Sequence, residues 1–128
     1  MDINMPKDLN EIVFPFCPVR NVLARVGDKW SLLVLHELSK SENTPLRFSV
    51  IKKGIPDISQ KILTSTLRML EEDGYISRVV YAEVPPRVEY NLTARGHSFI
   101  GVCRPVIKWA IDNLSEIMSD RKMNMSKK

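Results

Sequence analysis

The sequence has few of the residues on which most enzyme and metal sites depend. Its 128 residues include only two cysteines, two histidines and five glycines. Two cysteines cannot hold a structural zinc ion without histidines at ligand spacing, and His36 and His97 stand far apart in the chain. The sequence also has no glycine-rich phosphate loop and no nucleophile at motif spacing from a base. We therefore expect no enzymatic activity, no metal ion and no cofactor.

Long apolar runs are missing as well. No stretch approaches the roughly 20 residues that span a bilayer, and the acidic, interrupted amino terminus does not resemble a signal peptide. These features predict a soluble, cytoplasmic protein with no membrane partner. Because cytoplasmic thiols are kept reduced, a structural disulfide between Cys17 and Cys103 is not expected.

The charge is moderate in total but concentrated in one stretch. The chain carries a formal net charge of +4, a sequence pI near 9.2, and a length that fits one domain. Residues 47–68 alone carry five cations and one acid, and 5 − 1 gives the same +4. The charged residues of this stretch are Arg47, Lys52, Lys53, Asp57, Lys61 and Arg68. A local excess of this kind is typical of a phosphate-binding surface.

Residues 59–73 show the periodicity of an amphipathic helix. Leu63, Leu67 and Leu70 recur at helical spacing and predict a buried face. Ser59 fits the amino-terminal cap, and Gly74 fits the residue that ends the helix. The opposite face carries only polar and basic side chains, which are Ser59, Gln60, Lys61, Thr64, Ser65 and Arg68.

Two strand-like runs follow this helix. Residues 76–81 and 87–92 are rich in Val, Ile and Tyr, and the strand-breaking pair Pro85-Pro86 lies between them. A solvated helix face would usually mean only contact with water. A basic helix followed at once by a basic-flanked hairpin instead predicts a winged helix-turn-helix, a mainly α fold with a small antiparallel β-hairpin. Arg78 and Arg87 flank the expected wing.

The remaining sequence divides into four parts. Residues 1–16 form an arm whose Phe14 and Phe16 are too apolar for a loose tail, and residues 17–92 form the DNA-binding core. Within this core, Pro18 opens a helix with an expected core stripe, Gly27 ends it, and Asp28 caps a central buried helix. The expected stripe consists of Val19, Val22, Leu23 and Val26. Leu46-Arg47-Phe48 is expected to add a short strand beside the wing.

Residues 93–118 are predicted to form the dimerisation helix region. Apolar side chains cover more of this helix than one small domain can bury, so we expect a partner subunit to cover the rest. The expected dimerisation residues are Phe14, Phe16, Phe99, Val106, Trp109, Ala110, Ile111, Leu114 and Ile117. Pro105 predicts a kink or break, and residues 119–128 read as a polar tail that frays.

An ordered set of motifs resembles the HxlR-type family of bacterial transcriptional regulators, which are relatives of the MarR regulators. The resemblance covers roughly residues 17–109. It rests on Cys17-Pro18, Gly27-Asp28-Lys29-Trp30, Arg47-Phe48, Ile58-Ser59-Gln60-Lys61-Ile62-Leu63-Thr64, Leu70-Glu71-Glu72-Asp73-Gly74-Tyr75-Ile76-Ser77-Arg78, Pro85-Pro86-Arg87-Val88-Glu89-Tyr90 and Leu92-Thr93-Ala94-Arg95-Gly96. It implies a homodimeric winged-helix protein that binds double-stranded DNA and dimerises through its terminal regions.

For such a dimer we expect an inverted-repeat operator whose half-sites are centred about 34 Å apart. Gln60, Lys61 and Thr64 are assigned to base edges, because they lie near the start of the recognition helix. The residues assigned to the phosphate backbone and its surroundings are Arg47, Ser59, Ser65, Arg68, Arg78 and Arg87. A winged-helix module that binds another protein through the same surface is the alternative.

The control of DNA binding has more than one interpretation. Cys17 at a helix amino terminus has the environment of a reactive thiol, and relatives in the family are thought to sense oxidants or electrophiles at a matching cysteine. The other interpretation is that Cys17 is a small buried packing residue. Trp30 and Trp109 could line a pocket for a small-molecule effector or could simply pack.

Overall fold

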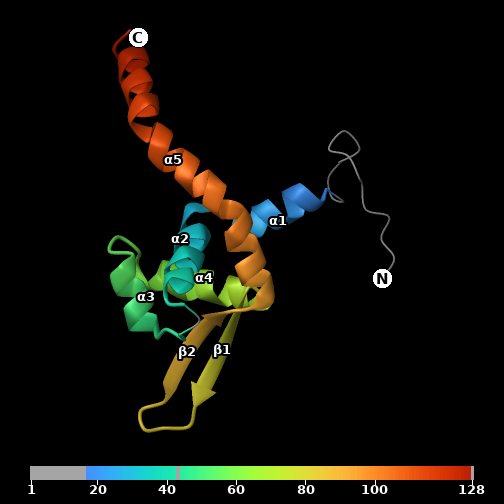
Figure 1. The fold of residues 1–128 in the computed structure, drawn as a ribbon. Coiled ribbons are helices and arrows are strands. Elements are labelled where there is room, and N and C mark those ends of the chain that lie inside the picture. The colour runs from blue at the N-terminus through green and yellow to red at the C-terminus, as the bar shows by residue number, and fades with distance from the viewer. Residues whose placement is uncertain (1–16, 43, 128) are drawn as a thin grey trace.

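A computed structural model describes residues 17–42 and 44–127. It consists of five helices and one two-stranded antiparallel sheet, and the long last helix extends away from the body (Figure 1). The expected arm, with Phe14 and Phe16, lies outside the described residues. The elements in chain order are α1 (Pro18–Val26), α2 (Lys29–Lys40), α3 (Phe48–Gly54), α4 (Gln60–Glu72), β1 (Ile76–Tyr81), β2 (Arg87–Leu92) and α5 (Ala94–Ser126).

A capping side chain fixes the residue at which each of the helices α2, α4 and α5 begins. Asp28 Oδ1 accepts the Ser31 N–H at 3.3 Å, Ser59 Oγ accepts the Ile62 N–H at 3.0 Å, and Thr93 Oγ1 accepts the Gly96 N–H at 3.2 Å. Each bond satisfies a donor that the helix itself cannot pair. The expected caps of α2, α4 and α5 are therefore confirmed.

The core lies where α2, α4 and the start of α5 meet. The fully buried side chains of this core include Val34, Leu35, Leu38, Ile51, Ile58, Leu63, Leu70 and Ile100. The predicted inner face of α4 is confirmed, because Leu63, Leu67 and Leu70 are all buried. The helix ends at Glu72 with Asp73 as its cap, and the expected glycine follows: Gly74 has a φ of +80°, a conformation that glycine adopts without strain. The expectation that α2 is the central buried helix holds in part, because Val34, Leu35 and Leu38 are buried while Leu33 is 41% exposed.

The wing has the strands that the sequence predicts. β1 pairs antiparallel with β2 from Ile76 opposite Leu92 to Tyr81 opposite Arg87. Leu46 forms an isolated antiparallel bridge with Tyr90, so the expected third strand is reduced to one residue. Phe48 instead begins α3, because the chain turns into the helix directly after Arg47.

The expected core stripe of α1 is wrong for the chain by itself. Val26 is buried, whereas Val19, Val22 and Leu23 are 44%, 41% and 51% exposed. Figure 1 shows that α1 points away from the α2–α4 body, so only its last residue reaches the core. The amphipathic pattern correctly identified an apolar face on α1, but it did not show which surface covers that face.

One expectation about α5 holds in part and a second is wrong. The helix continues without a break through Pro105, and Figure 1 shows that its axis bends along its length. Bending relieves the clash between a proline ring and the preceding turn, so one lost hydrogen bond does not end a helix of 33 residues. Residues 119–126 are helical rather than a fraying tail. Extending a formed helix adds one hydrogen bond per residue without a new nucleus.

Candidate nucleic-acid interface

The outer face of α4 presents a continuous polar surface. Gln60, Lys61, Thr64, Ser65 and Arg68 are all exposed and line one shallow depression on this helix. The opposite face is fixed by Leu63 and Leu67 in the core, so α4 cannot rotate without exposing leucine. The structure therefore brings together those residues assigned to DNA that lie on α4, and the opposite face of this helix is packed in the core.

The hydroxyl groups on this face are already oriented by the helix. Ser59 Oγ accepts the Ile62 N–H, while Thr64 Oγ1 donates to Gln60 O at 2.8 Å and Ser65 Oγ donates to Ile62 O at 3.0 Å. Thr64 and Ser65 therefore offer outward acceptor lone pairs, whereas the Ser59 hydroxyl still has its proton to donate. Gln60 and Lys61 form no side-chain bond among the described residues and supply the free donors.

The turn before α4 uses one of the expected cations for its own structure. Lys52 Nζ donates to Ile58 O at 3.2 Å, and Ile55 and Ile58 are buried beneath the turn. This bond holds α3 against the start of α4. Lys53, Lys61 and Arg68 remain exposed, and so does Arg47 at the start of α3.

Arg87 is held inside the wing. Its guanidinium lies 4.1 Å from the centre of the Tyr81 ring, its Nη1 lies 3.1 Å from Glu83 Oε1, and its Nε lies 3.6 Å from Glu89 Oε2, too far for a hydrogen bond. Two acids neutralise its charge before any ligand approaches. The sequence does contain a sign of this pairing, because Glu83 precedes Arg87 by four residues and Glu89 follows it by two.

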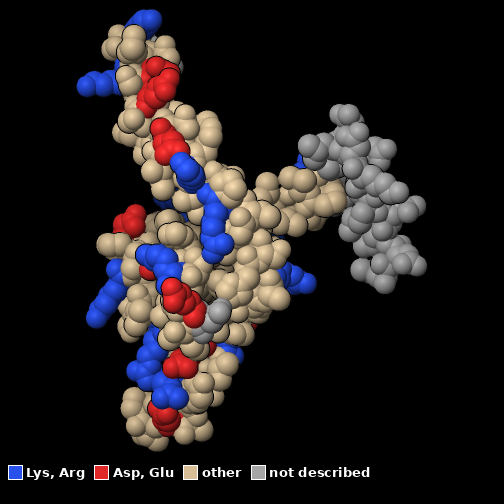
Figure 2. Space-filling view, viewed as in Figure 1, with Lys and Arg blue, Asp and Glu red and all other residues tan. Residues whose placement is uncertain are grey.

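Arg78 is better placed than Arg87 to contact a DNA phosphate. It is exposed on β1 and lines a groove of about 340 Å³ between α3, α4 and the wing. Arg68 lines the same groove from α4, so the structure brings these two cations together from segments separated in sequence. Figure 2 shows basic side chains over the α3 side of the body and the base of the wing, with acidic side chains among them. Glu71 lines the groove as well, whereas the residues that line the exposed face of α4 include Lys61 and Arg68 and no acid.

The expected dimerisation residues of α5 fall into two groups. Those that are exposed are Val106, Trp109, Ala110, Ile111, Leu114 and Ile117. Phe99 differs, because its ring packs 5.5 Å from that of Tyr75 at the edge of the chain's own core. Phe99 is partly buried in this way, and its assignment to the partner surface stays a prediction. Helix α1 adds a second exposed apolar face, formed by Pro18, Val19, Val22 and Leu23.

The two cysteines have different surroundings. Cys17 is the amino-terminal cap of α1, is 3% exposed, and accepts the Arg20 N–H at its Sγ over 3.2 Å. Cys103 packs against the core from α5, and burial raises the pKa of its thiol. A raised pKa keeps Cys103 as the less reactive neutral thiol.

Some sites do not occur in the described part of the chain. Within residues 17–42 and 44–127, no group of three or more His, Cys, Asp or Glu side chains is placed to hold a metal ion. No helix in the same ranges is long and apolar enough to span a bilayer.

Comparison with known proteins agrees with this geometry. The sequence profile of the HxlR-like helix-turn-helix family matches residues 25–118. An uncharacterized HTH-type transcriptional regulator of Methanothermobacter thermautotrophicus is 47% identical over 93 residues, which are 73% of this chain and 69% of that protein.

Solved structures share the fold. A putative transcriptional regulator, ytfH, from Salmonella typhimurium is 35% identical with a TM-score of 0.73, over 83% of this chain and 92% of that one. The redox regulator HypR in its oxidized form is 35% identical with a TM-score of 0.68, over 76% of this chain and 97% of that one. This chain is therefore a winged-helix member of the HxlR-like helix-turn-helix family of transcriptional regulators.

Proposed function

We propose that this protein is a sequence-specific transcriptional regulator that acts in the cytoplasm as a homodimer on an inverted-repeat DNA operator. The observation that carries the proposal is the exposed face of α4, where Gln60, Lys61 and Arg68 are free of intramolecular partners among the described residues. A rigid helix with free donors matches the major groove in width and chemistry. Arg78 on the wing would contact the adjacent backbone.

A salt titration tests DNA binding against the protein-interaction alternative. Duplexes are first selected from a random DNA pool by the intact protein, and binding is then measured by gel shift at increasing salt. Binding through about six phosphates predicts a loss of affinity of roughly 10³-fold between 50 and 200 mM salt. Failure to select any sequence, or an affinity that does not change with salt, would favour a module that binds protein.

The homodimer is proposed from two apolar faces. Val19 and Leu23 on α1, together with Val106, Trp109 and Leu114 on α5, expose large apolar side chains on two elements that project from the body (Figure 1). Soluble monomers rarely expose contiguous apolar surface of this extent. A second copy related by a two-fold axis covers both faces at once and places two copies of α4 on one side.

We further propose that Cys17 makes the regulator responsive to oxidants. Support comes from its position at the amino terminus of α1 and from the likeness to HypR, which is described as a redox regulator. In the reaction with hydrogen peroxide, the thiolate sulfur takes one oxygen atom, giving a sulfenic acid and hydroxide. A polar, larger group at the buried cap would disturb the start of α1 and thereby the proposed dimer.

Peroxide should therefore change the affinity of the protein for its selected duplex by about fivefold or more. The gel shift is measured before and after treatment for the parent, Cys17→Ser and Cys103→Ser. Cys17→Ser should keep basal binding and lose the response, whereas Cys103→Ser should respond like the parent. If Cys17→Ser responds fully, Cys17 is a packing residue and the sensor lies elsewhere.

A further inference from the structure

Among the described residues, the one α1 residue that belongs to the buried core cluster is its last, Val26. Val26 is buried, whereas Val19, Val22 and Leu23 are exposed and α1 points outward (Figure 1). Gly27 then ends the helix, and its backbone N–H donates to Leu23 O at 2.9 Å. The direction of α1 therefore depends on the contacts that its carboxyl end makes with the rest of the chain.

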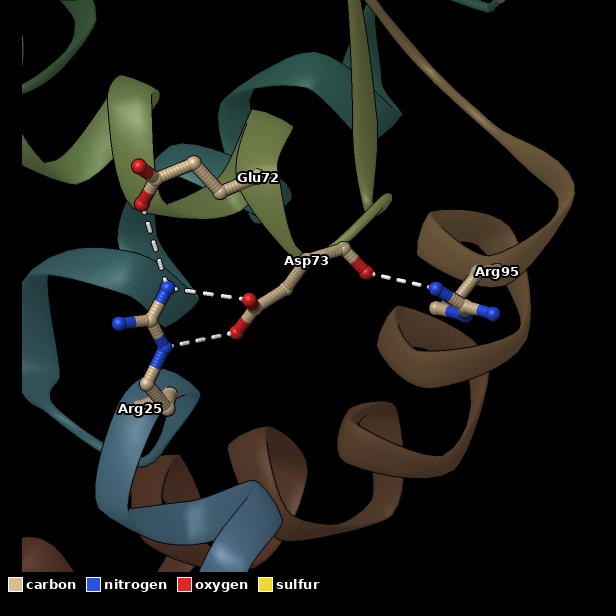
Figure 3. A network of polar contacts seen from close by, with 4 residues as sticks. All are labelled: Arg25, Glu72, Asp73 and Arg95. Atoms are coloured by element: carbon tan, nitrogen blue, oxygen red, sulfur yellow. Dashed lines mark hydrogen bonds and ion pairs between the residues drawn. The ribbon is translucent and has the colours of Figure 1, made fainter. Parts of the chain in front are cut away.

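Arg25 makes the polar part of that attachment. Its Nε lies 2.9 Å from Asp73 Oδ2 and its Nη2 lies 3.0 Å from Asp73 Oδ1, so the guanidinium and the carboxylate form a two-bond fork. Nη2 also lies 3.3 Å from Glu72 Oε1. Asp73 caps the carboxyl end of α4, and Figure 3 shows Arg25 reaching from α1 to this end of the recognition helix.

The same turn is held from the other side by the start of α5. Arg95 Nη1 donates to Asp73 O at 2.7 Å, and Thr93 Oγ1 donates to Gly74 O at 2.6 Å. A Cβ at Gly74 would lie 2.6 Å from Arg95 Nη1, so glycine also leaves room for this arginine. The end of α4 is therefore clamped between α1 and α5, the two elements that carry the exposed apolar faces (Figure 3).

The solvent exposure of these side chains determines how much their ion pairs contribute to the stability of the fold. The side chains of Arg25, Glu72 and Asp73 are 48%, 59% and 32% exposed. Ion pairs this exposed add little to the stability of a fold. A two-bond fork does, however, fix the relative direction of the two groups it joins. Orientation, rather than stability, is what the pair supplies.

We propose that Arg25 and Asp73 are positioning residues that set the angle between α1 and the recognition helix, and thereby the separation of the two recognition helices. This inference rests on the proposed homodimer on an inverted repeat. In that dimer α1 is fixed to the partner, so a change at Arg25 moves α4 relative to the two-fold axis. One base pair corresponds to about 3.4 Å along the duplex, so a small rotation is enough to change the preferred half-site spacing.

The test measures how the affinity for DNA depends on the spacing between the two half-sites. Duplexes selected by the parent protein are made with the centre lengthened or shortened by one and two base pairs, and as a single half-site. Arg25→Gln and Asp73→Asn remove the charge while keeping side-chain volume close. Arg20→Gln is the matched control, because Arg20 is exposed on the same helix and its side chain forms no bond among the described residues.

The parent and Arg20→Gln should each bind best at one spacing. Arg25→Gln and Asp73→Asn should lose roughly fivefold or more at that spacing and flatten the preference, with single half-site affinity unchanged. Full spacing preference in both variants would overturn the inference while leaving operator binding intact, and so would an equal loss on half-site and full site. If the parent itself selects no inverted repeat, the proposed function fails first.

Discussion

Replacing Trp109 and Ile111 together by aspartate should raise the dissociation constant of the homodimer by about a thousandfold or more. Both side chains are large and apolar, and they are 60% and 74% exposed in the single chain. In the proposed dimer they are covered, and an unpaired charge left in such a contact costs about 3 to 5 kcal/mol. Since 1.4 kcal/mol is a factor of ten, even one such cost exceeds a hundredfold. Sedimentation measurements of mass against concentration check this directly.

The control for this double variant is Ser115→Asp with Ser119→Asp. Both serines are exposed on the same helix, neither belongs to the residues proposed to contact the partner, and they receive the same two charges. The control should stay dimeric, and circular dichroism should show whether the Trp109 and Ile111 variant is a folded monomer or unfolded. A stable monomer that binds the inverted repeat with undiminished affinity would contradict the proposed assembly.

The features predicted correctly are those determined by neighbouring residues. A cap needs only a side-chain oxygen two or three residues before a free N–H, so Asp28, Ser59 and Thr93 could be identified from the sequence. The strand bounds followed from residue type and the intervening proline pair in the same way. The buried face of α4 followed from leucine spacing.

The errors concern what covers a face and how far a helix runs. The apolar stripe of α1 and Phe99 of α5 have similar patterns, yet the first is exposed and the second packs on Tyr75. Periodicity shows that a face is apolar but not which surface meets it. The helical residues 119–126 were missed because polarity indicates exposure, not backbone conformation.

Side-chain partners distant in sequence could not be predicted either. Arg25 and Asp73 are 48 residues apart, and only the packed fold brings them together. From the sequence, Arg87 was expected to contact DNA from the wing, but in the structure its guanidinium forms ion pairs with Glu83 and Glu89. Its assignment to DNA stays a prediction. Arg78 and Arg68 have the better geometry, because both are exposed, line one groove and form no ion pair among the described residues.

The last prediction separates base reading from phosphate contact on α4. Gln60→Ala should cost about 1 to 3 kcal/mol of binding free energy and relax sequence preference at one position in each half-site. Gln60 is expected to behave this way because its amide is the free two-sided donor and acceptor nearest the start of the helix. Arg68→Ala should instead weaken all sequences alike and make the salt slope shallower by about one for each protomer.

Lys122→Ala is the matched control for the arginine, because it removes one positive charge from an exposed site on α5, far from α4. Its salt slope should equal that of the parent if only cations at the interface release counterions. Competition gel shifts against single-position variants of the selected duplex measure both effects. If Lys61→Ala and Arg68→Ala bind every duplex like the parent at moderate salt, the exposed face of α4 does not contact DNA, and a protein partner becomes the better assignment for it.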